Sequence, residues 1–92
     1  MFHVYILLSL RDAKFYTGFT SNLKLRIEQH NNGEVASTKN RRPLALIYYE
    51  CYLQEADARR NEKYYKTTKG RTDLRKKLKD ILKKYNGTIA QR

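Results

Sequence analysis

Two short apolar runs at the start of the chain favour extended structure. Residues 2–9 are rich in β-branched and aromatic side chains, and residues 15–20 combine three aromatic rings with two threonines and a glycine. Residues 10–14 between them are polar enough to form a turn. Because the link is so short, the two runs are expected to pair as an antiparallel hairpin.

A short helix is expected after the hairpin. Ser21 or Asn22 can accept a hydrogen bond from the free backbone N–H groups of a first helical turn, so either residue can cap a helix. The helix should run to about Asn31, because Asn32 and Gly33 tolerate the left-handed backbone that ends many helices. One helix is therefore predicted between the hairpin and the next polar segment.

A polar, basic loop at residues 34–42 precedes a third strand and a second helix. Pro43 opens the strand, residues 44–52, at a position where its missing N–H disrupts no pairing. The second helix should cover roughly residues 54–68, and Gly70 should break it.

A third helix is expected over residues 73–85, because apolar residues recur there at helical spacing. The apolar side consists of Leu74, Leu78, Ile81, Leu82 and Tyr85. Residues 86–92 should form a tail. The order β-β-α-β-α-α predicts one α/β (α+β) domain over residues 1–92, with its core at about 2–84, in which helices flank a small, mainly antiparallel three-stranded sheet.

The positive charge is concentrated in the second part of the chain. The formal net charge is +11; residues 1–34 carry four basic and three acidic side chains, a net of +1, and residues 35–92 carry sixteen and six, a net of +10. Such a field attracts polyanions, chiefly nucleic acid and then an anionic membrane surface. A solvated basic face that only aids solubility is the plainer interpretation.

Cysteine and histidine contents exclude several classes of protein. The single cysteine, Cys51, lies in an apolar run and is expected in the core, and one cysteine with two histidines cannot make a zinc finger. The apolar run at residues 4–8 is too short for a signal peptide, and no run reaches membrane-spanning length. We therefore expect a cytoplasmic protein without a membrane partner.

Two polar residues interrupt the apolar side of the first helix. Leu23 and Ile27 define that side, and Arg26 and His30 fall on the same stripe, one turn apart. Either residue alone is explained by a position at the edge of the core. Together on one face, the pair favours a functional site.

Glu62 is a carboxylate on the more apolar side of the second helix. Ala58 and Tyr65 flank it at helical spacing, and it is expected to point away from much of the positive charge around Arg59. A carboxylate in such a place needs a partner. It could accept a salt bridge from Arg26, or hold a divalent cation by one oxygen, as Mg²⁺ sites often do.

The hairpin brings two tyrosines to one face. If Leu10 and Arg11 form a two-residue loop, Tyr5 lies directly opposite Tyr16, and Gly18 leaves an open space beside them on the same face.

These residues resemble the half-motifs of the GIY-YIG nucleases. The resemblance starts with His3-Val4-Tyr5 and Tyr16-Thr17-Gly18 and continues, over about residues 2–84, through Thr20, Asn22-Leu23, Arg26, His30-Asn31, Gly33, Thr38, Pro43-Leu44, Tyr48, Glu50, Ala56, Glu62 and Lys66. Their order and spacing look like those of the small stand-alone bacterial GIY-YIG proteins, in which Gly18 and Thr20 are motif positions.

The resemblance implies phosphodiester hydrolysis with one Mg²⁺ or Mn²⁺ ion. By correspondence of position, Glu62 holds the metal and Arg26 binds the scissile phosphate. Tyr5 and Tyr16 are the motif tyrosines around the attacking water, and His30 matches a position that assists them.

The chain departs from the family pattern at three positions. His3 replaces the first glycine, Thr17 is a mild change, and Phe19 stands where some branches place a lysine that lowers the pKa of the tyrosine. Activation of the tyrosine therefore falls to His30 or the metal.

The function expected from these features is metal-dependent endonucleolytic cleavage of DNA. Selectivity should be for structure rather than sequence, as in DNA repair or recombination, because no reader domain is attached. The binding residues expected in the loop and the later helices are Lys39, Arg41, Arg42, Lys66, Lys69 and Arg71.

Two other functions remain open at this stage. The chain could be a nucleic-acid-binding module that keeps the fold and does not cut, or a basic interaction protein that docks through its third helix. A protein partner could supply targeting. The sequence leaves open DNA against RNA, the oligomeric state, and which of Tyr5, Tyr16 and His30 is the general base.

Overall fold

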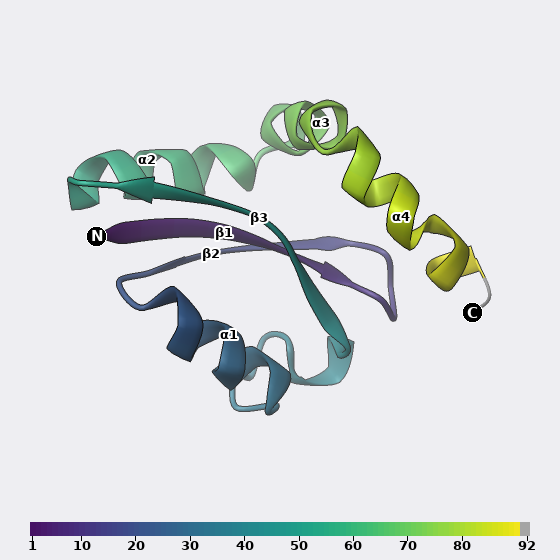
Figure 1. Cartoon of the computed structure of the whole chain (residues 1–92). Helices are drawn as coiled ribbons and strands as arrows, with labels where there is room; N and C mark the ends of the chain where they lie inside the picture. Colours follow the sequence, from purple (N-terminus) through teal and green to yellow (C-terminus); the bar gives the residue numbers. More distant parts are fainter. Residues whose placement is uncertain (91–92) are drawn as a thin grey trace.

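The protein is built on a three-stranded sheet with helices on both faces (Figure 1). The computed structural model describes residues 1–90. Its elements are β1 (Phe2–Ser9), β2 (Phe15–Thr20), α1 (Leu23–Asn31), the 3₁₀ turn η1 (Lys39–Arg41), β3 (Leu44–Tyr52), α2 (Glu55–Tyr65), α3 (Thr68–Lys77) and α4 (Lys79–Ala90). The α+β class and the antiparallel three-stranded sheet are confirmed, with one helix more than predicted.

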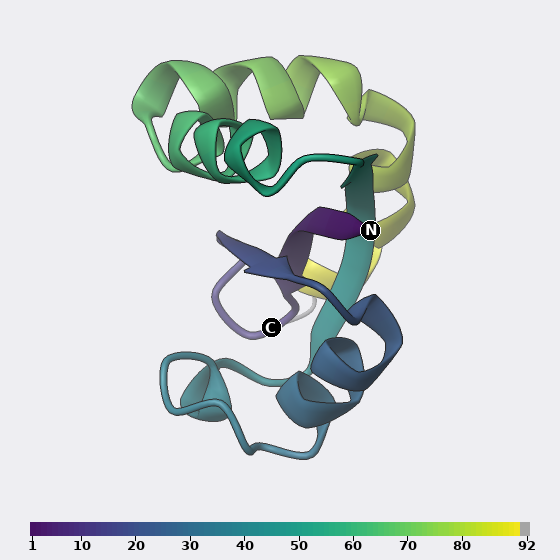
Figure 2. The same ribbon diagram turned by 90° about the vertical axis from the view of Figure 1, so that its left-hand side faces the viewer.

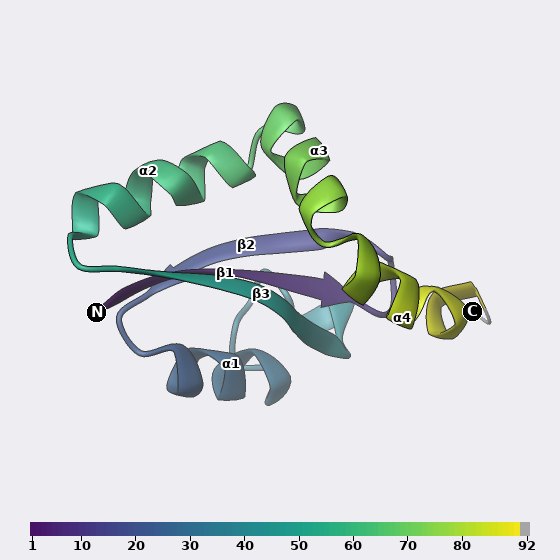
Figure 3. The same cartoon turned by 45° about the horizontal axis from the view of Figure 1, so that its top comes forward.

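Strand β1 lies at the centre of the sheet and pairs antiparallel with both neighbours, which leaves β2 and β3 at the edges. Helices α2 and α3 cover one face, and α1 with the loop that follows it covers the other (Figure 2). Helix α4 follows α3 at the end of the sheet where the β1–β2 hairpin turns (Figure 3). The sheet therefore separates two layers of side chains.

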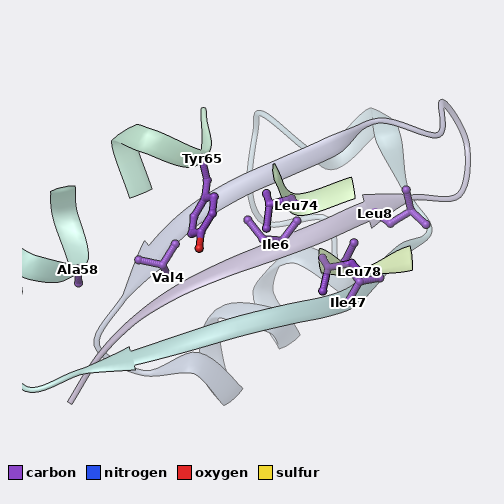
Figure 4. Close-up of a cluster of buried hydrophobic side chains, with 8 residues drawn as sticks. All are labelled: Val4, Ile6, Leu8, Ile47, Ala58, Tyr65, Leu74 and Leu78. Atoms are coloured by element: carbon purple, nitrogen blue, oxygen red, sulfur yellow. The ribbon is translucent and has the colours of Figure 1, made fainter. Parts of the chain in front are cut away.

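The larger core lies under α2 and α3 (Figure 4). It consists of Val4, Ile6, Leu8, Ile47, Ala58, Tyr65, Leu74 and Leu78, with Ile81, Leu82 and Tyr85 packed against it. The apolar side predicted for the third helix is thus confirmed. Burial of such side chains stabilises a fold by roughly 1.5–3 kcal/mol each, so this layer holds α2, α3 and α4 to the sheet.

Gly70 does not break a helix, contrary to the sequence prediction. The break lies at Thr67, whose side chain accepts a hydrogen bond from the Gly70 N–H and so caps α3. A Cβ on Gly70 would lie 2.0 Å from the backbone oxygen of Tyr64. The glycine is needed because α3 begins in close contact with the end of α2.

The helix predicted over residues 73–85 is in fact divided between α3 and α4. The division falls at Leu78, whose backbone leaves helical geometry (φ −105°, ψ 26°). Helix α4 continues through Asn86-Gly87 to Ala90, so the predicted tail is wrong up to that residue. Residues 91–92 of the tail lie outside the described part.

The register of the hairpin differs from the prediction. Tyr5 pairs with Gly18, and Leu7 pairs with Tyr16. The loop is longer than two residues because Ser9 and Lys14 close it: the Ser9 N–H donates to the Lys14 oxygen at 3.0 Å. The shift is two residues, an even number, so both tyrosines keep the same face.

Candidate active site

A second, smaller cluster lies on the α1 face of the sheet. Its buried members are Tyr5, Leu7 and Leu44, and Tyr16, Leu23, Ile27 and Leu46 pack against them. Two of the buried residues come from the central strand, which is the most rigidly held part of the sheet. This face therefore fixes the position of the Tyr5 hydroxyl.

The ring of Tyr5 occupies the space above Gly18 that a side chain at this position would need. A Cβ at Gly18 would lie 2.3 Å from both Cζ and the hydroxyl oxygen of Tyr5. The open space that the sequence predicted beside Gly18 is therefore absent, because the tyrosine directly across the ladder occupies it. The glycine lets Tyr5 lie across β2 and reach helix α1.

A buried chain of hydrogen bonds begins at Tyr5. Its hydroxyl lies 2.8 Å from Nε2 of His30, and Nδ1 of His30 lies 2.7 Å from Oγ1 of Thr38. His30 and Thr38 are fully buried. The loop after α1 thus holds the imidazole in place from the side opposite Tyr5, a role for Thr38 that no sequence pattern indicated.

Burial controls the protonation of this chain. It raises the pKa of Tyr5 to about 12, although the positive charge of Arg26 acts in the opposite direction. Burial, with a further contribution from the charge of Arg26, lowers the pKa of His30 to about 4. At neutral pH the tyrosine therefore carries its proton and the imidazole is neutral.

Tyr16 completes a group of three rings. Its centroid lies 5.1 Å from that of His30 and 6.4 Å from that of Tyr5. Its hydroxyl is 3.5 Å from Oγ of Ser37, at the margin of hydrogen bonding, and it is more exposed than Tyr5. Tyr16 is thus the tyrosine of the pair that faces solvent.

The charge of Arg26 lowers the pKa values of Tyr5 and His30, so the guanidinium lies within electrostatic range of both side chains. Its guanidinium donates to Oε1 of Gln29 at 3.1 Å, one turn along α1. The alternative of an Arg26–Glu62 ion pair is not observed. The guanidinium keeps most of its donors for another acceptor.

Glu62 lies on α2, which covers the face of the sheet opposite α1 (Figure 2). Its oxygens contact Nζ of Lys66 at 3.1 Å and Nη1 of Arg59 at 3.7 Å, so the prediction that it points away from the Arg59 charge is wrong. Its side chain is only 16% exposed, and its charge opposes ionisation of Tyr5. The Glu62 carboxylate therefore lies within electrostatic range of the Tyr5 hydroxyl.

Glu62 is the carboxylate of this site that could hold a metal. Among the described residues, no group of three or more His, Cys, Asp or Glu could enclose an ion. One carboxylate fits Mg²⁺, which usually keeps several waters and takes its other ligands from substrate phosphates. The donor set therefore suits an ion that binds together with a phosphodiester.

The basic residues predicted to bind nucleic acid differ in their freedom to do so. The guanidinium of Arg41 is held by Asp12 at 2.7 Å and lowers the pKa of that carboxyl to about 2, so Arg41 braces the hairpin turn. Arg42 donates to the Lys39 oxygen and lies over Gly33. Arg41 is therefore a structural cation, whereas Arg42 stays exposed.

The remaining predicted cations lie near the junction of α2 and α3. Lys66 pairs with Glu62, Lys69 is exposed, and the Arg71 guanidinium donates to the Lys66 oxygen at 2.7 Å. They therefore surround the end of the helix that carries Glu62.

A second carboxylate, Glu50, lies on the opposite face of the sheet. It accepts hydrogen bonds from the hydroxyls of Tyr48, Tyr52 and Tyr65. Burial opposes its ionisation, but these hydrogen bonds together outweigh burial and hold the pKa of Glu50 below its usual range. The alternation of Tyr48, Glu50 and Tyr52 on one strand could have predicted this cluster, which links β3 to α2.

Cys51 is exposed, contrary to the prediction that it lies in the core. It pairs with His3 across β1 and β3, and its sulfur lies 3.3 Å from Nε2 of His3. Tyr49, which is 54% exposed, lies next to them on the α1 face. The bulge near Leu46 places Tyr48 in the core layer and Tyr49 outside it.

Comparison with known families agrees with this arrangement. The sequence model described as the GIY-YIG catalytic domain matches residues 1–86. The chain therefore belongs to the GIY-YIG family, a family of nucleases that act on nucleic acid and generally use divalent metal ions. In the described residues no helix is long and apolar enough to cross a membrane.

Small bacterial proteins are similar to this chain over most of its length. UPF0213 protein CPE1444 of Clostridium perfringens is 43% identical over 67 residues, covering 72% of this chain and 71% of that protein. The UPF0213 protein in ldhD 5′ region of Pediococcus acidilactici is 37% identical over 91 residues, covering 96% and 86%. The solution NMR structure of the UPF0213 protein BH0048 from Bacillus halodurans is 29% identical, with a TM-score of 0.52 and coverage of 80% and 82%.

Stability should depend on pH through His30. Its pKa is about 4 in the folded chain against 6.5 without the fold, so the unfolded chain binds more protons between these values. The free energy of unfolding should therefore be highest above pH 6.5 and fall by up to about 3 kcal/mol as pH decreases to 4. Urea unfolding at a series of pH values between 7 and 4 measures this free energy.

A His30→Gln variant is the control for this pH dependence. The free energy of unfolding of this variant should decrease much less between pH 6.5 and 4, because glutamine does not titrate. A wild-type midpoint that stays constant from pH 7 to 4.5 would contradict a buried, neutral His30.

Proposed function

We propose that the protein is a metal-dependent endonuclease that hydrolyses phosphodiester bonds in DNA at the α1 face of its sheet. The observation that carries this proposal is the convergence of Tyr5, Tyr16, His30 and Arg26 on one face, within electrostatic range of Glu62. The family membership supports the same reaction class. Selectivity is for DNA structure, because the cations that the chain presents suit phosphates, which carry no base sequence.

Proton transfer is assigned to the Tyr5–His30–Thr38 chain. With the proton of Tyr5 directed to Nε2 of His30, Nδ1–H donates to Thr38. As the Tyr5 oxygen accepts a proton from the attacking water, it releases its own to His30. This relay suits a tyrosine whose pKa is raised to about 12, because a free phenolate is not required.

Charge stabilisation is assigned to Arg26 and Glu62. The guanidinium of Arg26 can bind two non-bridging phosphate oxygens as a fork. A Mg²⁺ or Mn²⁺ ion held by Glu62, when bound, supplies a Lewis acid for the phosphodiester. Glu62 must then exchange its contacts with Lys66 and Arg59 for the ion.

The test is cleavage of labelled single-stranded, duplex, nicked, flap and branched DNA with Mg²⁺, with Mn²⁺ and with EDTA. Wild type should cut at least one substrate only when metal is present. Tyr5→Phe keeps the ring beside Gly18 and removes the hydroxyl, so its rate should fall by about a hundredfold, the lower end of typical general acid–base contributions.

Control variants separate loss of chemistry from contamination or unfolding. Tyr64→Phe, prepared in parallel, removes a hydroxyl that bonds Asp73 away from the site and should leave the rate unchanged. Equal cutting by all three proteins indicates a contaminating nuclease. Salt-sensitive binding with no cutting of any substrate indicates a binding module instead.

A further inference from the structure

A basic hollow lies on the α3 side of the sheet, opposite the face that carries Tyr5, Tyr16 and His30 (Figure 2). It has a volume of about 380 Å³ and is lined by Lys14, Phe15, Arg71 and Arg75. Phe15 packs against the core under α2 and α3, whereas its neighbour Tyr16 packs with Tyr5 on the α1 face. Edge strand β2 therefore has the candidate active site on one side and this hollow on the other.

Three cations surround the hollow, and in the described part of the chain none of them forms an ion pair. The nearest carboxylates in sequence are Asp12, which is bound to Arg41, and Asp73, which accepts a hydrogen bond from the Tyr64 hydroxyl. The local charge is therefore close to +3, which favours an anion with several acceptor oxygens.

The cations are held in place by the protein itself. The Arg71 guanidinium donates to the Lys66 oxygen at 2.7 Å, and the Arg75 guanidinium lies over the Phe15 ring at 4.6 Å. The backbone of Lys14 is fixed by Asp12 and by Arg41. Groups ordered before a ligand arrives lose less entropy on binding it.

We propose that the hollow bounded by Lys14, Arg71 and Arg75 binds a phosphate group of the nucleic acid that is cut on the α1 face. A strand crossing the edge of β2 would contact both sides. Arg59 covers Phe19 at 3.7 Å beside Glu62, and Phe15 lies four residues away, roughly 13 Å along the strand. The phosphate bound in the hollow is therefore a different one from the phosphate that is cleaved. The choice of nucleic acid as the ligand rests on the proposed function.

The test is DNA binding in EDTA, so that it does not depend on cleavage. The variant combines Lys14→Gln, Arg71→Gln and Arg75→Gln. Each phosphate contact contributes about 0.7–0.9 to the slope of log affinity against log salt, so the slope should decrease by about two to three. The charge-matched control combines Lys24→Gln, Lys63→Gln and Lys83→Gln, which replace exposed lysines on α1, α2 and α4.

Two further arms identify the source of the phosphate. Equal binding of DNA with and without a 5′-terminal phosphate indicates a backbone phosphate, and a preference for the phosphorylated end indicates a terminal one. Titration of inorganic phosphate, followed by amide NMR shifts at Phe15 and Arg71, tests the hollow directly and also reports that the variant is folded.

A slope that decreases equally in the charge-matched control, with no phosphate-induced shifts in wild type, would overturn the proposal. If the hollow binds phosphate but no DNA is cut under any condition, the proposed function fails while this site stands. If DNA is cut but the hollow variant binds DNA like its control, the phosphate site is wrong while the proposed function stands.

Discussion

Replacing Glu62 by alanine should reduce metal-dependent DNA cleavage by about three orders of magnitude. Lewis-acid catalysis by a bound ion contributes several kcal/mol, and every 1.4 kcal/mol is a factor of ten in rate. Glu62 is the one carboxylate assigned to that ion in the proposed site. Single-turnover cleavage with saturating enzyme measures the effect on chemistry alone.

The same variant should bind DNA at least as well as wild type. Removal of Glu62 frees Lys66 and Arg59 from their ion pairs and takes a negative charge from the surface. Glu55→Ala, an exposed carboxylate on the same helix, is the matched control and should cut at the wild-type rate. Cleavage by Glu62→Ala within threefold of Glu55→Ala would exclude Glu62 as the metal ligand.

The sheet was predictable from the sequence because its signals are local. The hairpin follows from two runs of β-branched and aromatic residues with a short link, the third strand from Pro43, and the first helix from the Asn22 cap. Each signal spans only a few residues. The register of the hairpin was not predictable, because Ser9 Oγ accepts from the N–H groups of Arg11 and Asp12 and closes a longer loop. Such a side-chain contact leaves no periodic pattern.

The predicted helix boundaries are wrong where contacts between helices determine the true boundaries. Gly70 is a poor residue for an isolated helix, yet α3 includes it because a side chain there would meet the backbone of Tyr64. Cys51 was assigned to the core because neighbouring residues are apolar. The bulge in β3, where Ile47 is the extra residue opposite the step from Ile6 to Leu7, changes which residues of β3 face inward.

The sequence names the residues of the candidate site, but it does not disclose the hydrogen bonds between them. Helical spacing brings Arg26 and His30 to one face; in the structure His30 bonds the Tyr5 hydroxyl, and the charge of Arg26 acts on it. The contribution of Thr38 comes from a loop without regular structure, so only the fold reveals it. The raised pKa of Tyr5 likewise follows from the burial of its side chain, and burial to that extent is not visible in the sequence.

Replacing Arg26 by alanine should reduce the cleavage rate by 10² to 10³-fold, on the order seen when a group that stabilises transition-state charge is removed. The charge of its guanidinium acts on the Tyr5 hydroxyl, and within the protein the guanidinium donates to Gln29. Arg26→Lys should recover only part of the loss, because an ammonium cannot bind two phosphate oxygens as a fork. Lys24→Ala, on the exposed side of α1, is the matched control.

An independent measurement distinguishes this role from a general loss of structure. The charge of Arg26 lowers the pKa of both Tyr5 and His30. In a folded Arg26→Ala variant the pKa of His30, followed by NMR of its ring protons, should therefore rise above about 4 while burial still holds it below 6.5. A lost rate with an unchanged His30 pKa would place the guanidinium away from the Tyr5–His30 pair. The assignment of Arg26 to the scissile phosphate at that pair would then be wrong.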